Sequence, residues 1–485
     1  MPLPLVAIIN WQEVTGWLAL AYLALSAGTV FWILWLKRDS TAAVAWCLTV
    51  IFIPYIGILL FVFFGYQSVH RPIRRKRRHA AAYKVRVERS DGTVRPVTVE
   101  PAAGWQGVSE LAQSLGADPL LPGNRVDLYY DGRAAYDAMF AAIAQAQHHV
   151  HMQMFIFRYD DIGKKFIDAL AERASAGVQV RFLYDAVGSW RLRRRMFAAL
   201  CEAGGYAEPF LPVKLFRRRL QINLRNHRKT VIVDGKVGFT GGLNVGGEYL
   251  GLDPFFGPWR DTFLRLEGPS VASLQRLFLE DWDFSAADTA RDQSFFPPVT
   301  KAGDAEVQVI WSGPDQELKI IREVYFAAIT RAKSRIWIAT PYFVPDVGLF
   351  DALCLAARSG LDVRLLCPFR PDKWVPFLAA RYYWNELLTA GMKIYQYTAG
   401  FMHAKVLLID DEWASIGTTN FDNRSLRLNF ELTCLIESSD VVRELEAQFL
   451  RDFAISIRVD RDRFMERPFV GRMAENASRL LSPLL

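Results

Sequence analysis

The residues best suited to chemistry in this chain form a short pattern that occurs twice. Its members are His227, Lys229, Asp234 and Asn244 in one copy and His403, Lys405, Asp410 and Asn420 in the other. In both copies the lysine is two residues after the histidine, the aspartate seven after it, and the asparagine ten after the aspartate. Two basic-flanked core strands would explain one such match, but not the same spacing twice. The pattern therefore indicates a duplicated functional motif.

These residue types suit a reaction at a phosphodiester. Because side chains of a strand alternate between its faces, the histidine and lysine of each motif point to the same side. One imidazole can attack phosphorus, the other can protonate the leaving oxygen, and lysine and asparagine can hold the phosphate oxygens. We therefore predict that the two histidines and two lysines are catalytic and that Asn244 and Asn420 bind phosphate. No carboxylates or histidines at metal-ligand spacing accompany the motifs, which predicts chemistry without a metal or cofactor.

A catalytic imidazole also needs a carboxylate to orient its second nitrogen. Asp234 and Asp410 are candidates, but each follows an apolar strand that ends roughly 16 Å beyond the motif lysine. That distance favours a structural role for them. Asp261 and Glu431 each open a later apolar strand, in matching positions of the two copies. We predict that Asp261 hydrogen-bonds the histidine of the first motif and Glu431 that of the second.

The elements that must position the motifs are duplicated as well. Apolar periodicity predicts a helix, a strand, a helix and a strand at 133–147, 150–156, 163–176 and 178–184, and again at 323–331, 336–339, 348–359 and 363–366. The two series lie roughly 180 residues apart, much further than the period of a solenoid repeat. The predicted fold is α/β, with two duplicated lobes of mixed sheet flanked by helices around one active site.

Composition shifts place the domain boundaries. The expected parts are a transmembrane hairpin (1–66), a basic juxtamembrane segment and linker (67–122), a first lobe (123–284), a linker (285–301) and a second lobe (302–485). In the hairpin, residues 17–36 and 41–66 are uncharged runs of 20 and 26 residues. Each is long enough to cross roughly 30 Å of hydrocarbon as a helix.

The charge of the chain is concentrated beside that hairpin. Lys and Arg number 58 against 51 Asp and Glu, and six of these basic residues lie between Arg71 and Arg78. Without those six the balance is 52 to 51, so the rest of the chain lacks the basic excess of a nucleic-acid-binding protein. The cluster predicts a multi-pass protein of the cytoplasmic membrane whose lobes face the cytoplasm, and it can also attract anionic lipid headgroups. Five widely spaced cysteines agree with a reducing compartment.

A second group of histidines, His148, His149 and His151, resembles a metal site only locally. These residues lie where a predicted helix passes into a predicted strand. We interpret them as surface or packing residues.

Taken together, the two HxKxxxxD motifs and their trailing asparagines resemble the phospholipase D superfamily. The hairpin, residues 260–262, residues 420–431 and the final Ser-Pro-Leu-Leu are similar to its bacterial cardiolipin synthase branch. The similarity covers essentially the whole chain. Gly242 and Thr418 stand where many relatives have serine, which puts a hydroxyl contact there in question.

The resemblance implies a phosphatidyltransferase that needs no nucleotide. One histidine would attack a phosphatidylglycerol, releasing glycerol and forming a phosphatidyl-histidine, and a second phosphatidylglycerol would then accept the group to give cardiolipin. It also implies that the motif residues, including Asp234 and Asp410, are catalytic. The first motif histidine is often the nucleophile in this family, which would be His227, but the near symmetry of the lobes leaves that open.

Two alternatives share these motifs, a membrane-bound phospholipase D-type hydrolase and a nuclease. Basic stretches at 191–195 and 217–219 keep the nuclease alternative open. The neutral body argues against nucleic acid, so the expected partners are phosphatidylglycerol and membrane lipid. The sequence leaves self-association open.

Overall fold

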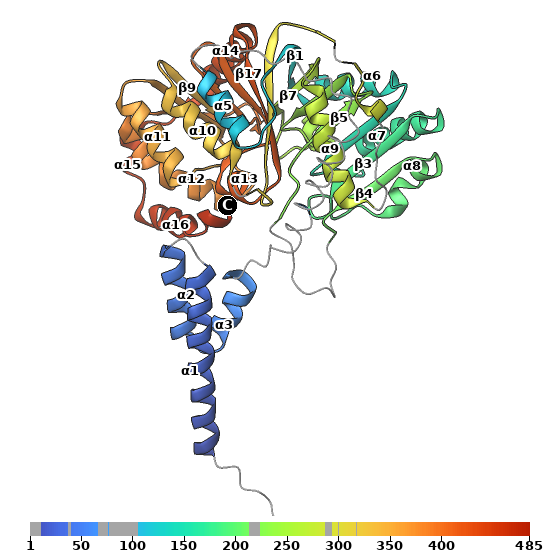
Figure 1. Ribbon diagram of the computed structural model, residues 1–485. Helices are drawn as coiled ribbons and strands as arrows, with labels where there is room; N and C mark the ends of the chain where they lie inside the picture. The colour runs from blue at the N-terminus through green and yellow to red at the C-terminus, as the bar shows by residue number, and fades with distance from the viewer. Residues whose placement is uncertain are drawn as a thin grey trace, which may run out of the picture. The chain divides into compact units, whose positions relative to one another are not determined.

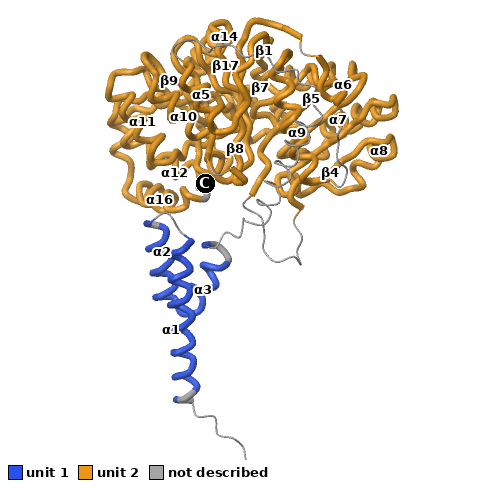
Figure 2. The backbone as a smooth tube through the Cα atoms, in the orientation of Figure 1, with its two compact units in different colours: residues 1–74, 215–219 blue, residues 75–214, 220–485 orange. Residues whose placement is uncertain are grey.

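The computed structural model describes residues 11–36, 40–65, 76, 105–212, 224–286, 293–298, 300–316 and 318–485. It divides the chain into two compact units, residues 1–74 with 215–219 and residues 75–214 with 220–485 (Figure 2). Apart from Lys76, the basic cluster at 71–78 lies outside the described residues, as do 217–219 and much of the predicted linker 285–301. The first unit holds the apolar N-terminal helices and the second holds both motif copies.

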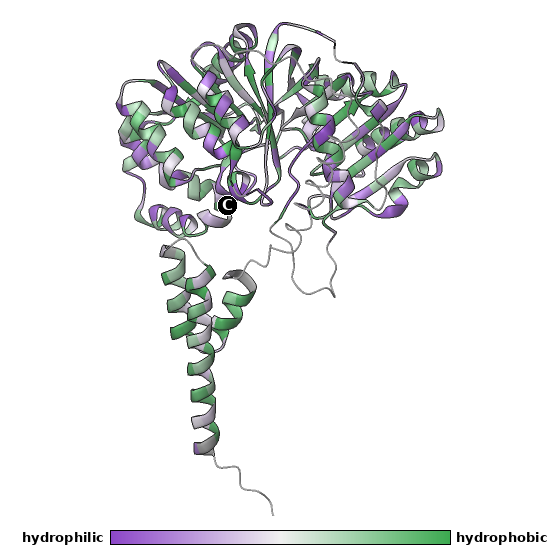
Figure 3. Cartoon of the chain, in the orientation of Figure 1, coloured by the Kyte–Doolittle hydropathy of each residue, from purple (hydrophilic) through white to green (hydrophobic). Residues whose placement is uncertain are grey.

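The first unit consists of α1 (Trp11–Leu36), α2 (Ser40–Phe52), α3 (Ile56–Leu60) and a π-helical turn (Phe61–Gly65). These helices are almost uniformly apolar (Figure 3). They pack on one another through a small core of Ile33, Ala43, Val50 and Phe61. Among the described residues, α1 is the one helix long and apolar enough to cross a membrane.

The second predicted span does not form one continuous helix. It breaks after Phe52, and Tyr55 adopts a positive φ of 57° before α3 begins. Pro54 explains the break, since proline lacks the N–H that continues a helix and its ring clashes with the preceding turn. The structure therefore shows one helix of spanning length, not the predicted pair of spanning helices.

The second unit contains two α/β lobes (Figure 1). The first lobe comprises β1 (Leu121–Asp131), α6 (Gly132–Ala144), β2 (His149–Met154), α7 (Asp161–Ser175), β3 (Gln179–Asp185), α8 (Ala198–Glu202), β4 (Tyr206–Phe210), β5 (Thr230–Val233), β6 (Val237–Gly241), β7 (Trp259–Glu267) and α9 (Val271–Ser285). The predicted helices and strands of this half are α6, β2, α7 and β3. Gly177, just after the end of α7, has the positive φ of 88° expected of a left-handed cap.

The second lobe repeats this order. Its main strands are β8 (Ala305–Ser312), β9 (Arg335–Ala339), β11 (Asp362–Pro368), β12 (Lys393–Tyr397), β14 (Val406–Ile409), β15 (Trp413–Gly417), β17 (Glu431–Glu437) and β18 (Ser456–Arg458), with short β10 (Phe343–Val344), β13 (Phe401–Met402) and β16 (Phe421–Asp422). Its helices are α10 (Ile320–Arg331), α11 (Val347–Arg358), α12 (Trp374–Ala390), α13 (Asn423–Arg427), α14 (Ser439–Ala454), α15 (Arg461–Met465) and α16 (Phe469–Arg479). The predicted α/β duplication is confirmed.

One continuous mixed sheet runs through both lobes. The strand order is β4-β3-β2-β5-β6-β7-β1 in the first lobe and β8-β17-β15-β14-β9-β11-β12-β18 in the second. The lobes join where β1 pairs antiparallel with β8, and β1 and β8 occupy equivalent places. The strand within each motif, β5 or β14, runs between the lysine and the aspartate, lies inside its half of the sheet and is wholly buried.

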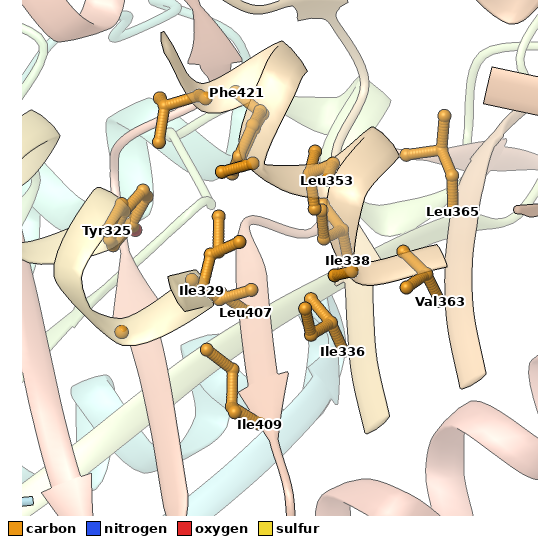
Figure 4. Packing of buried hydrophobic residues seen from close by; sticks show 14 of the residues in the cluster. Tyr325, Ile329, Ile336, Ile338, Leu353, Val363, Leu365, Leu407, Ile409 and Phe421 are labelled. Carbon is orange, nitrogen blue, oxygen red and sulfur yellow. The ribbon is translucent and has the colours of Figure 1, made fainter. Parts of the chain in front are cut away.

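The core of the second lobe shows why these sequences form these elements. Alternate apolar side chains of β9, β11 and β14 face helices α10 and α11 (Figure 4). Helix α5 (Gln106–Ser114) adds Val108 and Ala112 to this core, and the preceding Trp105 stacks on Trp413 with ring centroids 5.2 Å apart. The later part of the segment predicted as a linker at 67–122 therefore belongs to the second lobe.

Candidate active site

Each motif histidine lies just before a core strand and pairs through its backbone with the other lobe. The His227 N–H donates to the carbonyl of Phe430 at 2.9 Å. The His403 N–H donates to the carbonyl of Arg260 at 2.7 Å, beside the parallel pairing of β13 with β7. In both cases the accepting residue directly precedes an acidic residue. The main chain therefore sets each histidine beside a carboxylate of the opposite lobe.

The side chains complete this crossing. His227 Nδ1 lies 3.0 Å from Glu431 Oε2, and His403 Nδ1 lies 2.7 Å from Asp261 Oδ2. The structure thus brings both predicted carboxylates to the histidines, but the predicted pairing within each lobe is wrong. The reason is topological, because Asp261 lies near the start of β7 and Glu431 opens β17, the strands that flank the junction between the lobes.

Both carboxylates are buried and held by further donors. Asp261 accepts from the N–H of Thr262 at 2.8 Å, and Glu431 accepts from Asn429 Nδ2 at 3.0 Å. Burial by itself would raise the pKa of each carboxyl. For Asp261, the nearby Lys405 and His403 outweigh burial, and the pKa lies below its usual value. The pKa of Glu431 is lowered in the same way by its own histidine and lysine neighbours.

The serine positions of relatives differ between the lobes. Thr418 Oγ1 donates to Glu431 Oε2 at 2.5 Å, so a threonine supplies the hydroxyl contact in the second motif. At Gly242 a Cβ atom would lie 2.0 Å from Asp261 Oδ1. Glycine is needed there because the carboxylate occupies the space that a side chain would fill.

The motif lysines are buried beside the histidines. Lys229 Nζ donates to the His227 carbonyl at 2.7 Å and lies 5.2 Å from the centre of the Phe155 ring. Lys405 Nζ donates to the His403 carbonyl and lies 2.8 Å from His403 Nδ1. Burial lowers the pKa of Lys229 to about 7 and that of Lys405 to about 8. Each ammonium group is thus a desolvated donor whose charge can be lost near neutral pH.

The imidazoles are buried too, which disfavours their protonated forms. Burial is the largest cause that lowers the pKa of His227 to about 4 and that of His403 to about 3. The charge of Lys405 also lowers the pKa of His227, and that of Lys229 lowers the pKa of His403. The two motifs therefore lie within electrostatic reach of each other and form one site.

The motif aspartates Asp234 and Asp410 do not contact the imidazoles but hold backbone N–H groups at turns, and the catalytic role that the resemblance implied for them stays a prediction. Asp234 accepts three hydrogen bonds from backbone N–H groups of residues 147–149, and Asp410 accepts three from residues 333–335. Both have positive φ, 53° and 51°, at the turn after the motif strand. Aspartate tolerates this conformation better than most residues. They fix the turn and the neighbouring strand, as their distance along the strand predicted.

The two motif asparagines have different surroundings. Asn420 lines the cavity beside His227, and its Oδ1 has no hydrogen-bond partner. Asn244 Oδ1 instead accepts from the N–H of Ile156 at 3.0 Å, and its Nδ2 donates to the Tyr249 hydroxyl at 3.0 Å. The Asn244 amide thus holds a loop in place, and phosphate binding by this residue stays a prediction.

A cavity of about 440 Å³ opens beside His227. Its walls include polar and cationic side chains that the sequence motifs did not single out, namely Arg225, Tyr342, Lys373, Asp422 and Arg424. Three of these had a signal in the sequence, because Arg225 adjoins the motif at His227 and because Asp422 and Arg424 lie in the block 420–431 that begins at Asn420. Tyr342 and Lys373 had none, since only the fold brings β10 and the start of α12 to this wall.

Behind the first motif lies a buried ion-pair network centred on Asp281. Its carboxylate pairs with Arg228 at 2.7 Å and with Lys76 at 2.8 Å. Lys76 is 3% exposed and also lies 3.4 Å from Asp315. This member of the basic cluster therefore faces the protein interior, so the predicted attraction to lipid headgroups does not apply to it.

The histidine group at 148–151 has a packing role, as predicted, but His149 and His151 are fully buried and not surface residues. His149 Nε2 lies 2.9 Å from Gln275 Oε1, and the His151 ring stacks on Phe278 with centroids 4.7 Å apart. Burial lowers the pKa of His149 to about 4. Their nitrogens are engaged in the core under α9.

Comparison with known proteins agrees with this geometry. A family described as "Cardiolipin synthase, PLD-like domain" matches residues 139–255 and 325–453, and a phospholipase D-nuclease N-terminal family matches residues 24–65. Each of the first two ranges contains one motif copy. The chain is also similar in fold to the crystal structure of phosphatidylserine synthase from Haemophilus influenzae, with a TM-score of 0.61 and 14% identity over 78% of this chain and 100% of that one.

Curated relatives align over most of their length. The chain is 42% identical to the cardiolipin synthase of Geobacillus kaustophilus, covering 93% of this chain and 90% of the relative. It is 39% identical to the major cardiolipin synthase ClsA of Bacillus subtilis, covering 93% and 95%. The chain therefore belongs to the cardiolipin synthase family of the phospholipase D superfamily.

Proposed function

We propose that this protein transfers the phosphatidyl group of one phosphatidylglycerol to a glycerol hydroxyl of a second, giving cardiolipin and glycerol. The observation that carries the proposal is the pair of buried imidazoles, each oriented by a carboxylate from the opposite lobe, with two buried lysines beside them. The cardiolipin synthases among its relatives favour this acceptor over water. A nuclease or hydrolase activity would explain the two motifs equally well, but it would not explain the similarity of the chain to cardiolipin synthases.

His227 is the proposed nucleophile. It lines the cavity, and its Nδ1 lies against Glu431, so that Nε2 carries the lone pair. A neutral imidazole is the reactive form, and the lowered pKa of His227 keeps it neutral. Nε2 forms a bond to phosphorus while the bond from phosphorus to the glycerol oxygen breaks.

His403 then acts as acid and later as base. A bound phosphodiester carries a negative charge, which raises the pKa of the second imidazole and lets it take up a proton from solvent. That proton passes to the leaving glycerol oxygen. In the second half, His403 removes a proton from the hydroxyl of the incoming phosphatidylglycerol, whose oxygen attacks phosphorus as the bond to His227 breaks. Lys229 and Lys405 stabilise the charge on the phosphate oxygens.

We further propose that the chain crosses the cytoplasmic membrane twice and that the catalytic unit faces the cytoplasm. Helix α1 has spanning length, and the apolar run from 41 to 66 is long enough to cross despite its break at Pro54. Positive residues at 71–78 favour retention of that end on the cytoplasmic side.

The reaction is tested with the purified full-length chain and radiolabelled phosphatidylglycerol. Cardiolipin and glycerol in equal amounts are expected, whereas phosphatidic acid alone would identify a hydrolase. The variants H227A and H403A should each lose turnover while the thermal unfolding midpoint stays close to that of the wild type. Near-normal activity in both variants would exclude the two-histidine mechanism.

A further inference from the structure

Helix α16 (Phe469–Arg479) has its apolar side facing outward. Phe469, Val470 and Leu480 are 70%, 78% and 75% exposed, and Met473 and Leu481 are exposed as well. Residues spaced by about four positions share one helix face, so these side chains form a single apolar stripe. A helix on a protein surface normally turns such a stripe toward the core.

The inward side of the same helix is polar and firmly held. Glu475 is 2% exposed, and its carboxylate accepts hydrogen bonds from Arg381 Nε at 2.8 Å and from Arg467 Nε at 2.8 Å. Arg381 belongs to α12, so this buried pairing fixes α16 against α12 and prevents it from rolling its apolar stripe inward. A rotation of α16 that separated Glu475 from these arginines would leave its buried carboxylate without a cationic partner, which is unfavourable.

A second exposed apolar segment begins α12 and borders the active-site cavity. Trp374 is 67% exposed, and Phe369 is exposed nearby. Arg370 and Lys373, which lie between these two aromatic residues in the sequence, are exposed as well. Lys373 also lines the cavity that holds His227. Aromatic rings with lysine and arginine are typical of the interface between a bilayer and water.

We propose that α16 and the segment 369–375 form a membrane-docking face that rests on an anionic lipid bilayer and brings the cavity mouth to the lipid headgroups. The proposal rests on the proposed function, because a lipid substrate remains in the bilayer until its headgroup enters the site. Charge supports the bilayer as the occupant. Exposed Arg370, Lys373 and Arg472 accompany the apolar side chains and complement anionic phosphatidylglycerol.

The first test compares two substrates in the full-length chain reconstituted in phosphatidylcholine vesicles. One is long-chain phosphatidylglycerol in the same vesicles, and the other is a short-chain phosphatidylglycerol that dissolves as monomers. The double variant F469D/M473D should lose about tenfold in rate on the long-chain lipid and keep its rate on the soluble one. The control L450D changes an exposed leucine of α14, at the opposite end of the catalytic unit (Figure 1), and should behave as wild type.

Other outcomes would overturn the docking face. An unchanged rate on vesicle lipid would do so directly. An equal loss on both substrates would indicate damage to the fold, and a loss that accompanies conversion of a dimer to a monomer would indicate an interface between copies. The soluble substrate also tests the proposed function separately from the docking face. If the wild-type chain makes no cardiolipin from the soluble substrate, the proposed function is wrong, whatever happens at the membrane surface.

A second measurement does not depend on activity. Lipids brominated along their acyl chains quench tryptophans that enter the bilayer. Subtracting the signal of W374F from that of the wild type isolates Trp374, and this difference should be quenched in vesicles containing brominated phosphatidylglycerol. A difference signal that the bromines leave unchanged would show that the segment stays in water.

Discussion

Glu431 of the second lobe orients the imidazole of His227 in the first, with 3.0 Å between Oε2 and Nδ1. Asp261 of the first lobe stands in the same relation to His403, at 2.7 Å. Neither half-site is complete within its own lobe. The duplicated chain therefore needs both lobes joined along β1 and β8 before either histidine is oriented.

The crossed pairing predicts that E431Q acts on His227 and not on His403. Removing the carboxylate charge should lower the pKa of His227 further and reduce kcat by about 10²- to 10⁴-fold, because the imidazolium character that develops during the reaction loses its partner. Histidine resonances measured by NMR would report the effect on each ring. A shift confined to His403 would contradict the pairing.

The packing at Gly242 predicts that G242A is harmful although it adds one methyl group. Its Cβ would displace Asp261, and misplacing an orienting group by about 1 Å can reduce kcat by about 10²-fold. KM should change little, because the cavity wall is untouched. A matched control is G247A, where an added Cβ meets its nearest neighbour at 3.5 Å. Equal activity of the two variants would show that Asp261 tolerates the displacement.

The buried lysines predict an unusually early alkaline loss of kcat/KM. The oxyanion donors act only when charged, so activity on soluble substrate should fall as the pH rises through the pKa of Lys229, about 7, and of Lys405, about 8. The histidines, with pKa values of about 4 and 3, stay neutral across that range. In K229R the first group cannot lose its charge, so the alkaline limb should move up toward the pKa of Lys405. A limb that starts only above pH 10 would exclude these lysines as its source.

The Asp281 network predicts that K76A destabilises the catalytic unit. Lys76 is buried against Asp281, and its loss removes one of two cationic partners while Arg228 remains. The free energy of unfolding should fall by about 1.5–3 kcal/mol, the range for hydrogen bonds to charged groups. Thermal unfolding followed by near-UV circular dichroism measures this. K164A, which removes an exposed pair with Asp161, should change it by less than about 1 kcal/mol. Equal midpoints for the two variants would place Lys76 outside the interior.

The proposed orientation predicts which thiols react and when. Cys201 is exposed in the catalytic unit, whereas Cys354, Cys367 and Cys434 are buried. A maleimide that cannot cross membranes should leave intact cells unlabelled at Cys201 and modify it once the cells are permeabilised. The three buried thiols should react only after unfolding. Modification of Cys201 from outside would reverse the topology.

Much of this protein was determined by local sequence alone. Strand and helix periodicity placed α6, β2, α7 and β3 and their counterparts in the second lobe, because burial on one face imposes a period of 2 or 3.6 on apolar residues. The repeated spacing of histidine and lysine marked both half-sites for the same reason. The length of the apolar strand also indicated that Asp234 and Asp410 hold turns.

Tertiary structure decided which partners meet. No spacing within a lobe reveals that His227 reaches Glu431, because that contact follows from how β7 and β17 flank the junction between the lobes. The sequence does not distinguish Asn244 from Asn420, because both hold the same place in their motifs. Only the folded chain brings the N–H of Ile156 and the Tyr249 hydroxyl to the Asn244 amide. Lys76 likewise sits in a basic run that predicts exposure, and it is buried because Asp281, some 200 residues away in sequence, offers a desolvated carboxylate. Pairing across such separations depends on the closed fold, which composition and periodicity do not encode.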